Sequence, residues 1–136
     1  MKKLLLLLAI LPALTFALKM NAAGIQVSPT SLDFNTTGEK PTAQNITVVN
    51  PTADVQIFEV YPDDFTNVIS AYPGSFSLES GSKKIVKITV SPSKLKDNKP
   101  QKLGTSLSVI GKPLADKNFS VGTGVKIPIN ITAESF

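Results

Sequence analysis

The last part of the sequence alternates apolar and polar residues with a period of two, which an amphipathic helix cannot reproduce. Val125, Ile127, Ile129 and Ile131 are separated from one another by a single lysine, proline or asparagine. Successive side chains of a β-strand point to opposite faces, so this spacing places the four aliphatic side chains on one face. Pro128 has no N–H to donate. We therefore expect the strand to lie at a sheet edge, or to be paired on one side only, at that point.

Shorter runs of the same kind recur along the chain, separated by clusters of Gly, Pro, Asn and Ser. No sustained period of about 3.6 residues follows residue 23, so no long amphipathic helix is expected there. The pattern predicts an all-β sandwich of about seven strands, with a core of Val, Ile, Leu and Phe from two sheets. Nine short runs are candidates for these strands, and they are Ile25–Val27, Leu32–Phe34, Asn45–Val49, Val55–Val60, Thr66–Ser70, Phe76–Leu78, Val86–Val90, Leu103–Val109 and Val125–Ile131.

The expected strand Val55–Val60 changes phase in its middle. Its first half is apolar at Val55 and Ile57, whereas its second half is apolar at Phe58 and Val60. A β-bulge, or burial of both faces of the strand, would explain the shift.

The N-terminus has the composition of a secretory signal peptide. Lys2 and Lys3 precede an apolar run that extends to Phe16, and small residues follow at Ala17 and Ala22. Because a membrane span needs about 20 apolar residues, this run is too short to cross comfortably. We expect a helical signal peptide over residues 1–23, cleaved between residues 17 and 23, and one domain over residues 24–136. The alternative is an uncleaved N-terminal anchor.

Composition excludes several classes of function. The chain has no His and no Cys, so most metal sites, catalytic triads and thiol chemistry are excluded. Its basic residues are all Lys, and outside the leader 11 of them oppose 10 acidic residues, a balance that does not favour nucleic-acid binding. The Lys-rich stretch from Lys94 to Lys102 is best explained as a solvated loop. We expect no enzyme activity, no metal, no cofactor and no membrane segment in the mature form.

Two short motifs are candidate sites. Asp63 and Asp64, with Glu59 nearby, could hold calcium or act in catalysis only if a loop brought them together; a solvated turn is the simpler interpretation. Gly122 and Gly124 lack the third glycine and the helix of a dinucleotide-binding motif, so a turn or bulge is expected there.

Aromatic residues gather in the middle of the sequence, and we expect the Phe members in the core and the Tyr members at its rim. An exposed patch for a partner is the alternative. The set comprises Phe58, Tyr61, Phe65, Tyr72 and Phe76. Glycosylation sequons at Asn35, Asn45, Asn118 and Asn130 are interpreted as chance matches, because two of them fall within expected strands.

Several segments resemble one immunoglobulin-like superfamily, which contains the N-terminal domain of periplasmic pilus chaperones (PapD-like) and the major sperm protein domain. Ile25–Pro29 and Leu32–Phe34 resemble its opening strand, and Ile46–Thr52 resembles its second strand and turn. Phe76–Ser82 and Val86–Pro92 resemble its Phe-x-Leu-x-x-Gly segment and the strand that follows. The resemblance implies a seven-stranded immunoglobulin-like sandwich that binds other proteins.

The sequence departs from the pilus chaperones in two respects. Those chaperones have two domains, whereas residues 24–136 have room for one. Their cleft grips a subunit carboxylate with an Arg and a Lys, and this chain has no Arg, so that anchor is not carried over.

From these features we expect an exported, periplasmic or cell-surface domain that binds another envelope or surface protein through a sheet edge or face. The expected partner-binding residues are Val125, Ile127, Ile129 and Ile131 on one edge, with Ile25–Val27 as a second candidate edge. The alternative is a periplasmic chaperone-like factor for surface or pilus-like subunits.

Overall fold

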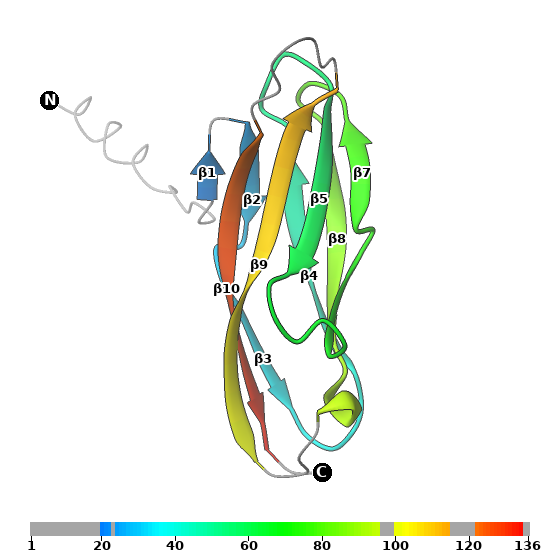
Figure 1. The fold of residues 1–136 in the computed structure, drawn as a ribbon, viewed down its shortest axis with the longest axis vertical. Helices are drawn as coiled ribbons and strands as arrows, with labels where there is room; N and C mark the ends of the chain where they lie inside the picture. Colours follow the sequence, from blue (N-terminus) through cyan, green and yellow to red (C-terminus); the bar gives the residue numbers. More distant parts are fainter. Residues whose placement is uncertain (1–19, 23, 96–99, 115–121, 135–136) are drawn as a thin grey trace, which may run out of the picture.

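The computed structural model describes residues 20–22, 24–95, 100–114 and 122–134 (Figure 1). The described chain is all-β, as predicted, with one short 3₁₀ turn, η2 (Pro92–Lys94). Within this part of the chain no helix is long and apolar enough to cross a membrane. The strands are β1 (Met20–Ala22), β2 (Ile25–Ser28), β3 (Leu32–Thr36), β4 (Thr42–Val49), β5 (Gln56–Pro62), β6 (Ile69–Tyr72), β7 (Ser75–Leu78), β8 (Lys83–Val90), β9 (Gln101–Pro113) and β10 (Thr123–Ala133).

The strands form two five-stranded sheets packed face to face (Figure 1). The first sheet has the order β1-β2-β4-β8-β6 and the second has the order β3-β10-β9-β5-β7. Alternate side chains from both inner faces fill the space between them, and the largest buried side chains are Phe34 and Phe58. The predicted sandwich with an aliphatic core is therefore confirmed.

The strand count of seven was wrong, because two strands at opposite sides of the sandwich each change sheet. The chain leaves the first sheet after β2 and enters the second as β3, and it crosses again between β6 and β7. Both crossings contain a cis peptide bond, Ser28–Pro29 and Tyr72–Pro73. Each crossing divides one strand of a seven-stranded sandwich into two short strands, which gives nine, and β1 is the tenth.

The sheet crossings leave half-length edges that a simple sandwich would not have. β3 pairs in parallel with β10 only from Ile129 to Ala133, and β2 pairs with β4 only from Thr47 to Val49. On the other side, β6 covers β8 only from Lys87 to Val90. Each long inner strand therefore has one stretch with a neighbour on both sides and one stretch with a neighbour on one side.

The expected phase shift in β5 is absent. Gln56, Phe58 and Val60 are buried while Ile57 and Glu59 are exposed, and the pairing with β9 runs without a bulge. The inward phase therefore begins with a polar residue, which hid the regular alternation in the sequence.

Gln56 can occupy an inward position because a hydrogen-bond network satisfies it. Its Nε2 donates to the carbonyl oxygen of Gly24 and to Asn50 Oδ1, both at 2.9 Å. Asn50 is fully buried, and its Nδ2 donates to the carbonyl oxygens of Asp54 and Leu78 at 2.8 and 2.9 Å. The network joins the β4–β5 turn to the end of β7 and to the start of β2.

Candidate functional site: the open edge of β10

The first half of β10 has a ladder partner on one side only. From Thr123 to Pro128 it pairs with β9, and β3 joins its other side only at Ile129. Among the described strands none pairs with that other side of β10 over Thr123–Pro128. β1 runs next to β10 and contacts it (Figure 1). The expectation that Pro128 is paired on one side only is therefore confirmed. We call the stretch Thr123–Pro128 the open edge.

The predicted partner-binding side chains lie inside the sandwich. Val125 is 9% exposed and Ile127, Ile129 and Ile131 are at most 1% exposed. They form part of the core, so a partner at this edge would meet the backbone of β10 and its outward side chains. Ile25 and Val27, the second candidate edge, are buried too, and β1 is paired with β2 on its outer side.

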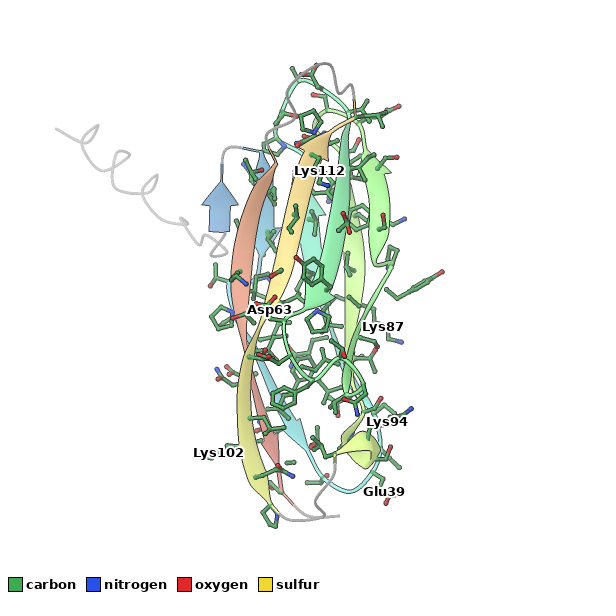
Figure 2. All side chains as sticks on the ribbon, in the orientation of Figure 1. Glu39, Asp63, Lys87, Lys94, Lys102 and Lys112 are labelled. Carbon is green, nitrogen blue, oxygen red and sulfur yellow. The ribbon has the colours of Figure 1, made fainter. Side chains whose placement is uncertain are left out.

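The outer face beside the open edge carries the one ion pair found among the described residues. Lys126 Nζ lies 2.5 Å from Asp63 Oδ2, and Ser108 Oγ donates to Asp63 Oδ1 at 2.6 Å. The hydrogen bond from Lys126, together with that from Ser108, lowers the pKa of Asp63 below its ordinary value. The same contact with Asp63 raises the pKa of Lys126. Both groups are therefore charged at neutral pH. Figure 2 labels Asp63 close to the end of β5.

A shallow hollow lies on this outer face next to the ion pair. Its volume is about 240 Å³, and Gly124 forms part of its floor. The absence of a side chain at Gly124 helps to form the hollow, because a Cβ there would stand 3.6 Å from Ile110 Cγ1. The other lining residues are Tyr61, Ser108, Ile110, Val125 and Lys126.

The two adjacent carboxylates do not converge. Asp63 binds Lys126 and Ser108, whereas Asp64 accepts a hydrogen bond from Thr105 Oγ1 at 2.8 Å. In the described residues no group of three or more His, Cys, Asp or Glu side chains could hold a metal. Asp63 and Asp64 thus fasten the β5–β6 turn to the second sheet, in agreement with a solvated turn.

The remaining sequence motifs are placed as follows. Thr123 and Gly124 pair continuously with β9, so the expected turn or bulge is wrong there. Asn35, Asn45 and Asn130 are exposed on strands, while Asn118 lies outside the described residues. The ends of the Lys-rich loop, Lys94 and Lys102, are exposed, as a solvated loop predicts, and residues 96–99 lie outside the description (Figure 2).

The aromatic set divides as expected. Phe58 is fully buried and stacks on Phe76, with ring centroids 5.8 Å apart. Phe65 and Phe76 are partly buried and pack against the core. Tyr61 and Tyr72 are 41% and 78% exposed. The Phe residues thus pack in or against the core, and the Tyr residues are exposed.

Sequence reasoning missed the contact of Lys126 with Asp63, and it missed the polar network of Asn50 and Gln56. Lys126 looked like an ordinary outward residue of an alternating strand, because its partner Asp63 is distant in the sequence. The Asn-Pro-Thr turn at Asn50 was the available signal for the network, since Asn, Pro and Thr are turn residues whose side chains bond to nearby backbone.

No family model matches the sequence, and no curated protein matches it. The structure is similar to that of the YadV chaperone, with a TM-score of 0.66 and 12% identity over 82% of this chain and 53% of that chain. The PapD-like domain 7 of human CEP192 is similar with a TM-score of 0.68 and 12% identity, over 93% of this chain and 96% of that chain. The CsuC–CsuE chaperone–tip adhesion subunit complex of Acinetobacter baumannii contains a chain that is similar with a TM-score of 0.58 and 16% identity, over 82% of this chain and 53% of that chain. This chain thus spans about half the length of the matched chaperone chains.

Proposed function

The chain has a PapD-like immunoglobulin-like fold, and from this premise we propose that it is an exported, non-enzymatic domain that binds an extended segment of another envelope or surface protein. The observation that carries the proposal is the open edge, where β10 has a neighbour on one side only. Unpaired N–H and C=O groups on such an edge accept a further strand by β-augmentation.

The open edge is held in shape before any partner arrives. Val125 and Ile127 anchor it in the core, and the ladder with β9 fixes its register. Binding would then order only the partner segment, which reduces the entropic cost of association.

The position of β1 connects this proposal to the expected signal peptide. Met20–Ala22 pair with Ile25–Val27 and contact β10, yet they lie within the expected cleavage window of residues 17–23. Cleavage at the end of that window would remove β1 and leave the outer side of β2 and the open edge unoccupied. Cleavage at its start would keep β1 in place.

A periplasmic chaperone-like factor for surface or pilus-like subunits is the second candidate. The fold supports it, since several similar structures are chaperones and one of them is a chaperone in complex with a pilin. The lack of Arg counts against transfer of the chaperones' carboxylate anchor. The apolar side chains of β10 are buried in the core, so they are not available to a subunit. We therefore rank the general protein-binding function first.

Site-specific photo-crosslinking tests the proposal. A photoreactive amino acid at Gly124, on the open edge, is compared with one at Asn130, an exposed position of β10 that has β9 on one side and β3 on the other. In the native envelope we expect a discrete crosslinked protein from position 124 and none from position 130. Crosslinks from both positions, or from neither, would contradict binding at this edge.

A further inference from the structure

The charges of the sandwich are divided unequally between its two sheets. Strands β2, β4, β6 and β8 of the first sheet contain Lys83, Lys84 and Lys87 and no acidic residue. The second sheet carries both signs, with Asp33 and Glu59 opposed to lysines on β9 and β10. One face of the molecule is therefore cationic although the mature chain is nearly neutral.

Lys83 and Lys84 lie in the half of β8 that β6 does not cover, and Lys87 lies at its boundary. Tyr72 of β6 pairs with Lys87, and the chain then leaves for the second sheet, so Lys83–Val86 have no ladder partner on that side among the described residues. Hydrogen-bonding groups alternate between the two sides of a strand, and β4 uses only one side. The backbone of Lys83–Val86 therefore offers free donors and acceptors in line with β6.

Two large apolar side chains are exposed next to this edge. Ile85 is 58% exposed and Tyr72 is 78% exposed. Lys83, Ile85 and Lys87 share the outer face, because they alternate with the buried Val86 and Ile88. Tyr72, the register partner of Lys87, lies on the same face. Figure 2 labels Lys87 next to β8, away from Lys102 and Lys112.

No described carboxylate neutralises these lysines. The one ion pair of the described residues joins Lys126 to Asp63 on the other sheet. Glu79, the acid nearest in sequence, lies in the turn before β8 and makes no ion pair with them. Lysines on an edge strand repel a second copy of the same edge, so self-association does not fit this surface.

We propose that Lys83–Val86 is a second strand-addition site, which takes an extended acidic segment of a partner protein as a continuation of β6. Acidic side chains of the segment would face Lys83 and Lys87, and an apolar side chain would cover Ile85 and Tyr72. The inference rests on the proposed function in that the domain binds proteins, but it names a different edge and a defined partner chemistry.

NMR titration of the isotope-labelled full chain tests the inference. The probe is a synthetic eight-residue peptide that carries Glu and Val in turn at every second position, with Thr between them, so that Glu and Val lie on one face of the strand. It is compared with a Lys–Val peptide of the same pattern and length and with a Glu–Val peptide N-methylated at alternate residues. We expect amide shifts at residues 83–87 and 69–72 with the first peptide only. Binding by the Lys–Val peptide would overturn the charge argument, and binding by the N-methylated peptide would overturn strand addition.

Charge-reversal variants supply the matched control. Lys83→Glu with Lys87→Glu should weaken the association constant about tenfold, because two attractive contacts become repulsive. Lys102→Glu with Lys112→Glu, on the second sheet, should change it less than about twofold. Equal losses in both pairs would overturn the site, as would binding of the chain to phosphatidylglycerol vesicles without any response to the peptide.

The result also separates this inference from the proposed function. Shifts confined to residues 123–128 would rule out the proposed site on β8 and would support binding at the open edge of β10. Shifts confined to β8, together with no crosslink from position 124, would do the reverse.

Discussion

Lys126 on β10 and Asp63 at the end of β5 form an ion pair of 2.5 Å that spans the intervening strand β9. Ser108 on β9 completes the contact, since its Oγ donates to Asp63 Oδ1 and accepts a bond of 3.3 Å from Lys126 Nζ. The arrangement connects β10, the strand with the open edge, to the turn between β5 and β6.

Replacement of Asp63 by Asn should give a small, pH-dependent destabilisation, because the pair is exposed to solvent. The folded-state pKa of Asp63 lies below 3.8, so its contribution is complete above that pH and disappears as the pH falls through the folded value. The folded-state pKa of Lys126 lies above 10.5, so the contribution is complete below pH 10.5 and is lost as the pH rises through the folded-state pKa. Urea unfolding at pH 2, 7 and 12 measures this. A difference between the two proteins that does not change with pH would contradict the ion pair.

Replacement of Ile127 by Ala should destabilise the domain by about 2–5 kcal/mol, the usual cost of a cavity at a fully buried aliphatic residue. Lys126→Gln, at the adjacent outward position, is the control and should have a much smaller effect. Chemical denaturation of both variants gives the comparison. Equal stability of Ile127→Ala and the wild type would show that β10 does not place its apolar side chains in the core.

Replacement of Gly111 by Ala should cost about 1–3 kcal/mol through overpacking. A Cβ at this position would stand 2.9 Å from Phe58 Cε1 and 3.3 Å from Ile25 Cγ1. Gly104→Ala is the matched control, because the nearest atom to its Cβ is Asn130 Oδ1 at 3.8 Å. In a thermal melt, Phe58→Leu should lessen the effect of Gly111→Ala, and additive losses would contradict a direct clash.

Replacement of Asn50 by Ala should destabilise the domain by about 2–4 kcal/mol. The change leaves the carbonyl oxygens of Asp54 and Leu78, and one bond of Gln56, without their partner in a buried site. Asn45→Ala, at an exposed position of β4, should be nearly neutral. Unfolding free energies of the two variants decide the matter, and similar values for both would mean that the network does not support the turn.

The sequence by itself determined which way most side chains point. Alternation placed the aliphatic side chains of Val125–Ile131 on one face of a strand, and those of Val86–Val90 on one face of another, and Pro128 indicated a strand paired on one side; the structure confirms all three. That the first set faces the core, where a partner does not reach it, came only from the structure. The rule works because the period of two follows from backbone geometry, which is local. It failed at Gln56, because a buried polar residue depends on partners that alternation does not reveal.

Tertiary structure alone decided which edges stay open and what they carry. The crossings after β2 and β6 leave half of β10 and half of β8 uncovered, and pairing in the fold brings Asp63 to Lys126 and Tyr72 to Lys87. These relationships join residues far apart in the chain, and they depend on where each strand stops pairing. Local propensity contains no information about a distant neighbour, so the candidate sites emerged only from the assembled sheets.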